Sequence, residues 1–207
     1  GDSLGAVDFS TGELSVWDDR GRYVRSLPRR GSVVRGGCRA DGLLLFERDI
    51  AITGRAGPRT STREYYTIDL DGVRENHVAS LSVARFSGPI SFEPSVLPYG
   101  DSFLIADPLR GELQLLDAGG RVERLVRLST VPSAPSVAEY RRRVLAFLPV
   151  GSSAEMVARF EAQRPASMPA FGPVKVDSDG RIWIQNADER RVWTIISRDG
   201  HVLDRVE

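Results

Sequence analysis

VKVDSDGRIWIQNADERRVWTIISRDGHVLDRV (residues 174–206) decides the fold of this 207-residue chain. It contains four short apolar runs that are separated by three turns, and two of these turns contain Asp-Gly. Glycine adopts positive φ without steric cost, so Asp-Gly suits the tight turns between antiparallel strands. The stretch therefore predicts consecutive antiparallel strands that are joined by tight turns.

The same pattern of strands and turns recurs along the chain. Its closing-turn glycines, Gly21, Gly72, Gly120 and Gly200, lie 51, 48 and 80 residues apart. The first two spacings match one four-stranded propeller blade, and the third matches a blade with an insertion. A β-sandwich also has short strands and frequent turns, but it does not predict the same order of turn types in each unit. We therefore predict an all-β fold, a β-propeller of four-stranded antiparallel blades.

We expect residues 1–207 to form a single, partial propeller domain, in which the first blade lacks its innermost strand. The four blades are predicted at about 1–28, 33–83, 89–128 and 171–207.

The insertion at residues 136–164 predicts a helical hairpin. The segments 136–139 (SVAE) and 152–155 (SSAE) both have the Ser-x-x-Glu form of a capping box, in which the serine side chain binds a free backbone N–H at the start of a helix. Pro149 and Pro165 are expected to end the two helices. We interpret the hairpin as a connection between blades, and a lid or partner-docking element is the alternative.

Composition excludes several classes of function. The chain is 41% hydrophobic, and its 28 basic and 28 acidic residues give a formal net charge of zero. Without a net positive field, nucleic acid is not an expected partner. Cys38 is the only cysteine, so no intramolecular disulfide can form. No run approaches the roughly 18 apolar residues of a membrane-spanning helix, and we expect no membrane span.

The phrases VKVDSDGRIWI (174–184) and DGHVL (199–203) resemble blade signatures of bacterial six-bladed β-propellers of the NHL-repeat and TolB-like kind. A helical insertion that ends in MPAF (168–171) before such a blade also fits that group. The resemblance implies a six-bladed ring and suggests a periplasmic or extracellular location. Because four units cannot close such a ring, we expect the chain to be part of a longer propeller. Closure by a second chain, through open blade edges, is the alternative.

Two short motifs suggest chemistry that their context does not support. GDSL (1–4) resembles the nucleophile block of a lipase and esterase family, but GDSF (100–103) repeats it at the same blade position. Because the motif recurs at the same position of the repeating unit, we interpret it as part of the blade structure and not as a catalytic site. The two Asp-x-Asp-Gly segments, 69–72 and 177–180, lack the further carboxylates of a calcium loop, so we interpret them as turns. We expect no catalytic residue, no cofactor and no metal in this chain.

The binding candidates come from position, since propellers bind ligands at the ring axis and at loops on one end. Arg35, Glu93 and Lys175 share strand parity, which predicts that they face the axis together. The segment 48–63 is predicted to be the longest polar loop and contains several arginines. The candidates are therefore Arg35, Glu93, Lys175, Arg48, Arg55 and Arg63. The tryptophans, Trp17, Trp183 and Trp193, are expected to pack between blades.

These observations predict a non-catalytic scaffold or recognition propeller that binds a protein, peptide or glycan. The resemblance implies an alternative, a hydrolase or lactonase with an axial metal ion. Glu93 is the only inner-strand carboxylate for that site, so blades outside this chain would have to complete it. A structural module that assembles through the helical hairpin is the third possibility.

Overall fold

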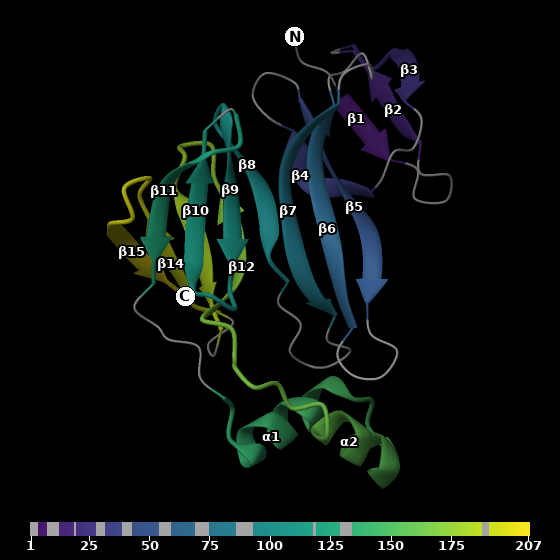
Figure 1. The fold of residues 1–207 in the computed structure, drawn as a ribbon, viewed down its shortest axis with the longest axis vertical. Coiled ribbons are helices and arrows are strands. Elements are labelled where there is room, and N and C mark those ends of the chain that lie inside the picture. The colour runs from purple at the N-terminus through teal and green to yellow at the C-terminus, as the bar shows by residue number, and fades with distance from the viewer. Residues whose placement is uncertain are drawn as a thin grey trace.

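The computed structural model describes residues 4–7, 13–18, 20–27, 32–38, 43–53, 59–68, 75–85, 93–117, 119–128, 134–187 and 191–207. These residues form four antiparallel sheets and one helical pair (Figure 1). The first sheet contains β1 (Leu4–Val7), β2 (Leu14–Trp17) and β3 (Tyr23–Leu27). The second contains β4 (Ser32–Cys38), β5 (Leu44–Thr53), β6 (Arg59–Ile68) and β7 (Glu75–Arg85).

The third sheet contains β8 (Ser95–Tyr99), β9 (Ser102–Asp107), β10 (Glu112–Leu116) and β11 (Val122–Arg127). The fourth contains β12 (Phe171–Val176), β13 (Ile182–Asn186), β14 (Trp193–Ile196) and β15 (Val202–Val206). Within each sheet the strands lie in chain order, and β8 contacts both β4 and β12. First strands that converge in this way are typical of propeller blades. The fold is an arc of an all-β propeller.

The predicted closing turns are confirmed where the structure describes them. Gly21, Gly120 and Gly200 have φ values of 72°, 81° and 83°. Each donates its N–H to the carbonyl oxygen three residues earlier, at 3.0 Å. Gly72 lies outside the described residues. The conformation of each of these hairpin turns is therefore set by its own glycine and the local hydrogen bond.

The predicted polar loop at 48–63 is wrong, because strands occupy most of this segment. β5 and β6 pair as far as Thr53 and Thr60, and Arg48 lies directly opposite Glu64. Opposite charges on facing residues stabilise a strand pair, so a charged segment can continue the ladder. β7 is likewise long, with 11 residues from Glu75 to Arg85. The second sheet is thus about twice as long as its neighbours.

The core lies between adjacent sheets. Buried side chains join the first sheet to the second through Val16 and Phe46, and the second to the third through Tyr65 and Phe103. The cluster between the third and fourth sheets is the largest of those in the described residues, and Leu113 lies in it. Each sheet is therefore held by apolar contact with its neighbours.

The tryptophans do not take the expected place between blades. Each ring is half-buried, and none belongs to the buried clusters of the described residues. Trp17 meets Tyr23 of its own sheet edge to face, with ring centroids 6.3 Å apart. Trp183 and Trp193 also contact side chains of their own sheet. Aliphatic side chains and the rings of phenylalanine and tyrosine fill the space between the sheets.

The helical pair consists of α1 (Val137–Phe147) and α2 (Ala154–Glu161), and it lies at one end of the sheets (Figure 1). Ser136 caps α1 as predicted, because its hydroxyl accepts the Glu139 N–H at 3.1 Å. The predicted cap of α2 is wrong by one residue. Ser152 donates its hydroxyl to the Pro149 carbonyl at 2.8 Å, and Ser153 caps the helix instead. No helix among the described residues is long and apolar enough to cross a membrane.

Candidate functional site

Two of the predicted binding residues, Arg63 and Glu93, lie against each other. The Arg63 guanidinium, on β6, is 2.9 Å from the Glu93 carboxylate, which precedes β8, and 3.4 Å from the Glu47 carboxylate on β5. The Arg63 side chain is only 15% exposed. The Arg63 guanidinium therefore attracts both carboxylates at the contact between the second and third sheets. This arrangement links two blades, which is a structural role.

Tyr65 completes this contact between the sheets. Its ring is almost fully buried, and its hydroxyl donates to the Pro94 carbonyl at 3.4 Å. Burial, followed by the nearby Glu47 carboxylate, raises the pKa of Tyr65 to about 12. The phenol is therefore neutral over the physiological range and acts as a hydrogen-bond donor.

The other predicted candidates lie apart. Arg48 binds Glu64 at 3.1 Å and Glu75 at 3.4 Å, and its guanidinium lies 5.0 Å from the centre of the Tyr66 ring. The hydrogen bond to Glu64 raises the pKa of Arg48. Lys175 is exposed and lies over the Trp193 ring at 5.2 Å. The side chain of Arg35 and the whole of Arg55 lie outside the described residues. The axial grouping of Arg35, Glu93 and Lys175 stays a prediction.

The GDSF motif at 100–103 has a turn geometry. Gly100 has a φ of 56°, and the buried Ser102 hydroxyl donates to the Tyr99 carbonyl at 3.0 Å. Since this hydroxyl is used within the turn, it does not point at a substrate. The residues of the other copy, 1–3, lie outside the described part of the chain.

The carboxylate of Asp177 is engaged within its own turn, whereas the other Asp-x-Asp-Gly segment, 69–72, lies outside the described residues. One carboxylate oxygen of Asp177 accepts the backbone N–H groups of Asp179 and Arg181 at 3.0 and 2.9 Å. The other accepts the Arg181 guanidinium at 2.7 Å and the Trp183 indole N–H at 2.8 Å. The Trp183 bond is the main cause that lowers the pKa of Asp177 to about 2. Across the described residues, no three His, Cys, Asp or Glu side chains are placed to hold a metal ion.

Replacing Asp177 by asparagine is expected to flatten the acid dependence of stability. The carboxyl pKa is about 2 in the folded protein and about 3.9 in the unfolded chain. Its contribution is therefore fully present above about pH 4 and is lost as the pH falls toward about 2. Urea denaturation at several pH values should show a shallower decline for Asp177→Asn than for the wild type. Asp101→Asn, at an exposed turn, is the control, and equal slopes for all three proteins would contradict the prediction.

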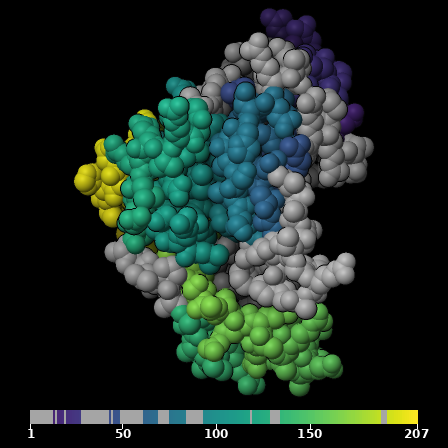
Figure 2. Space-filling model, in the orientation of Figure 1, coloured from purple at the N-terminus to yellow at the C-terminus, as the bar shows by residue number. Residues whose placement is uncertain are grey.

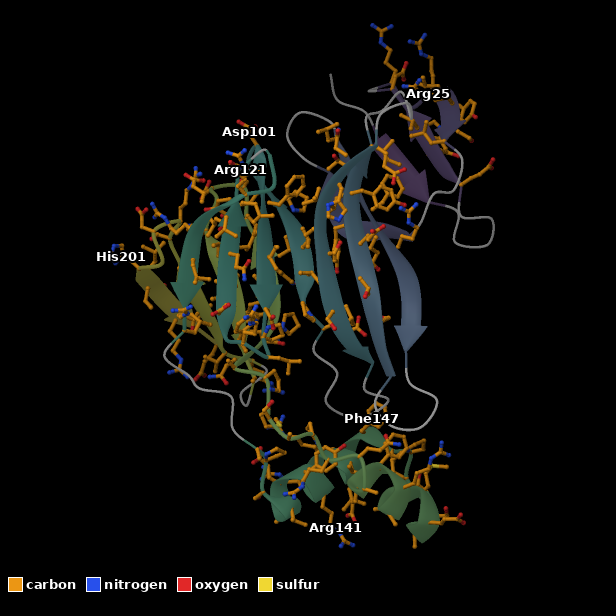
Figure 3. The ribbon with its side chains drawn as sticks, in the orientation of Figure 1. Arg25, Asp101, Arg121, Arg141, Phe147 and His201 are labelled. Atoms are coloured by element: carbon orange, nitrogen blue, oxygen red, sulfur yellow. The ribbon has the colours of Figure 1, made fainter. Side chains whose placement is uncertain are left out.

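A pocket of about 530 Å³ lies at the start of β7, between the second and third sheets. It is at the end of the sheets that carries the labelled turn residues Asp101 and Arg121, and the helical residues Arg141 and Phe147 lie at the opposite end (Figure 3). The lining consists of Leu43, Thr67, Glu75, Asn76, His77, Val78, Phe103, Gly119 and Gly120.

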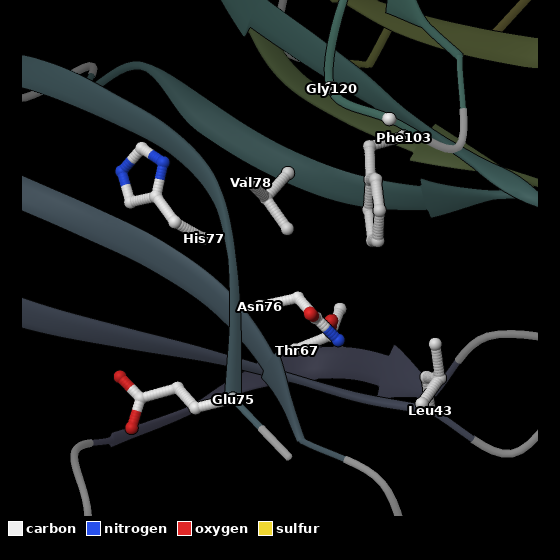
Figure 4. A pocket seen from close by; sticks show the side chains of 9 residues that line it. Leu43, Thr67, Glu75, Asn76, His77, Val78, Phe103 and Gly120 are labelled. Carbon is white, nitrogen blue, oxygen red and sulfur yellow. The ribbon is translucent and has the colours of Figure 1, made fainter.

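Alternation along β7 sorts the pocket residues onto two faces (Figure 4). Asn76 and Val78 lie on the side of Thr67 and Phe103, whereas Glu75 and His77 point to the other side of the strand. Thr67 and Phe103 are 3% and 2% exposed. The deep wall of the pocket is therefore uncharged, and the ionisable groups lie at its rim.

A β-bulge at Val78 shapes this part of β7. Tyr66 pairs with His77 and Tyr65 pairs with Ala79, so Val78 is an extra residue on the strand. Val78 and Ala79 both pack against the third sheet as a result. His77 and Ser80, three residues apart, meet on the opposite face with 2.8 Å between the imidazole Nε2 and the hydroxyl oxygen.

The β10–β11 turn forms the remaining wall. A Cβ atom at Gly120 would lie 3.2 Å from the Val78 carbonyl oxygen, so the absence of a side chain lets the turn approach β7 closely. Sequence reasoning missed this pocket. The only signal is Glu75-Asn76-His77, a polar run that opens a strand, and such a run reveals neither the bulge nor the facing turn.

No protein-family model and no curated protein matches the chain. Among solved structures, it is similar to virginiamycin B lyase from Staphylococcus aureus, with 10% identity, a TM-score of 0.40, and coverage of 97% of this chain and 50% of that one. A protein of unknown function from Bacteroides caccae has 10% identity and a TM-score of 0.38, with coverage of 95% and 54%. Glutaminyl cyclase from Myxococcus xanthus has 13% identity and a TM-score of 0.36, with coverage of 99% and 71%. The chain spans about half the length of the first two proteins.

Proposed function

We propose that this chain is part of a non-catalytic β-propeller that recognises an uncharged, hydrogen-bonding group of a protein, peptide or glycan ligand in the pocket at the start of β7. The observation that carries the proposal is the uncharged lining of this pocket, where the exposed Asn76 and the buried Thr67 offer polar atoms beside the buried Phe103. Ligand pockets typically combine apolar walls with a few placed polar groups, in volumes of roughly 300–1,000 Å³. The nearest carboxylate, Glu75, is already paired with Arg48.

The surroundings of His77 support a non-catalytic role. A catalytic serine needs a base, and that base needs a third group to orient it. His77 does bind the Ser80 hydroxyl, but both side chains are exposed and lie on the opposite face of β7 from Asn76. Among the described residues, no hydrogen bond or ion pair joins a carboxylate to His77.

The proposal extends to the whole ring. The repeated turns and the convergence of β4, β8 and β12 support a propeller. The sequence resemblance alone suggests six blades of the NHL-repeat or TolB-like kind and a periplasmic or extracellular setting. The alternative, a hydrolase or lactonase with an axial metal ion, would need Glu93 as a ligand. Glu93 is held by Arg63 at 2.9 Å, so that enzyme would depend wholly on carboxylates from other blades.

The test is a binding screen with monosaccharides and N-acetyl amino acid amides, measured by thermal shift and then by calorimetry. A ligand that binds only the folded state raises its melting temperature. Asn76→Ala is expected to weaken binding of a hit about tenfold or more, which is about 1.4 kcal/mol. Ser82→Ala, further along the same strand, should bind normally. Undiminished binding by Asn76→Ala would contradict the proposed site, and calcium-dependent lactone hydrolysis would favour the alternative.

A further inference from the structure

The outer strands of the four sheets differ in how their free edges are protected. β3, β11 and β15 have five or six residues, and each carries charge within its length. β7 has 11 residues, and its only charged residues, Glu75 and Arg85, are the first and the last. Natural edge strands are normally short or interrupted by charge or proline, because an unprotected edge pairs with other chains. Apart from the bulge, β7 has none of these safeguards.

The outer side of β7 is open along the described residues. The second sheet has the order β4-β5-β6-β7, and no backbone hydrogen bond joins β7 to any described strand other than β6. Ser80 and Ser82 are exposed, and the atoms of the second sheet lie at the surface beside those of the third sheet (Figure 2). Along the described residues, the backbone groups of β7 that face away from β6 therefore form no ladder with another strand. An extended backbone is the one ligand that can satisfy the whole row.

The pocket lies on the same strand. Asn76 and Val78 belong to β7 and line the pocket on the side of the third sheet. A strand added to β7 would lie about 4.8 Å away and would direct every second side chain toward that side. One of these side chains would reach the pocket. Its uncharged deep wall suits an uncharged side chain.

We propose that an extended peptide segment of a partner protein adds to β7 as a fifth strand and places an uncharged side chain in the pocket. This inference rests on the proposed function, because it names the ligand of the same site. Backbone hydrogen bonds would supply the affinity, and the pocket would supply the specificity.

The experiment selects binders from a displayed library of random 12-residue peptides and synthesises the best one in three forms. The forms are the unmodified peptide and two versions that are N-methylated at the odd or at the even residues. Only one alternating set of N–H groups points toward β7, so one methylated form should bind about tenfold or more weakly and the other nearly normally. Amide hydrogen exchange should slow in β7 when the unmodified peptide binds, and β15 is the internal control.

The outcomes separate this inference from the proposed function. If a selected peptide slows amide exchange in β7 but binds the Asn76→Ala variant as tightly as the wild type, strand addition to β7 is supported and the role of the pocket is contradicted. If both methylated forms bind equally well and the unmodified peptide binds Asn76→Ala more weakly than the wild type, the added strand is overturned. The proposed function of the pocket would still stand. If the library yields no binder, the inference that a peptide is the ligand is overturned. It is also overturned if the protein self-associates without peptide and amide exchange in β7 slows as a result.

Discussion

Replacing Arg63 by methionine is expected to lower the free energy of unfolding by about 2 kcal/mol. Arg63 is 15% exposed and forms ion pairs with Glu47 and Glu93, whose side chains are 28% and 30% exposed. Methionine keeps much of the volume but removes the guanidinium that holds these two carboxylates. Loss of one partner from a fully buried pair costs roughly 3–5 kcal/mol, and the partial exposure of both glutamates reduces that figure. Urea denaturation at neutral pH measures the change.

The control for this prediction is Arg198→Met. Arg198 also binds a carboxylate, Glu123 at 3.2 Å, but the two side chains are 57% and 50% exposed. Exposed pairs contribute about 0–1 kcal/mol, so this variant should unfold close to the wild type. Equal effects of the two substitutions would show that Arg63 contributes no more than a surface charge.

A double-mutant cycle locates the origin of the effect. Glu93→Gln removes one of the carboxylates that Arg63 neutralises, so Arg63→Met should cost less in that background than alone. Additive effects would contradict a direct interaction, despite the 2.9 Å separation of Arg63 and Glu93. The cycle also bears on the enzyme alternative, because a glutamate whose charge is needed for blade contact is a poor metal ligand.

Features that depend on local chemistry could be predicted from the sequence. The turns at Gly21, Gly120 and Gly200 follow from residues within four positions of each other, as does the Ser136 cap. Even local reasoning failed at α2, because two adjacent serines compete and the Pro149 carbonyl binds the first of them. The hydrogen bond from Ser152 to Pro149, which the Ser-x-x-Glu pattern does not include, leaves Ser153 as the cap of α2.

Features that depend on distant partners could not be predicted. Arg48 and Glu64 are each loop-like in isolation, and they form a strand pair only because the register places them opposite each other. Arg63 belongs to the arginine-bearing segment and Glu93 to a predicted inner strand, and 30 residues separate them in the chain. The pocket needs the bulge at Val78, a turn from another sheet and a nearby buried ring, none of which has a signature within one segment.

Replacing Leu113 by alanine is expected to lower the free energy of unfolding by about 3 kcal/mol. Leu113, on β10, is fully buried in the cluster between the third and fourth sheets. Its truncation leaves a cavity that strands held by their ladders cannot close. Urea denaturation measures the loss, and Leu125→Ala is the matched control, since that side chain is 40% exposed on β11.

The same variant tests whether the blades act through nearest neighbours. Leu113 contacts the fourth sheet, whereas the pocket at β7 lies between the second and third. If each blade is stabilised mainly by its neighbours, Leu113→Ala should speed amide exchange in β12–β15 more than in β5–β7. Under native conditions it should leave binding at the β7 pocket within about twofold of the wild type, since sites without shared contacts behave independently. A uniform increase in exchange across all four sheets would show instead that the arc unfolds as one unit.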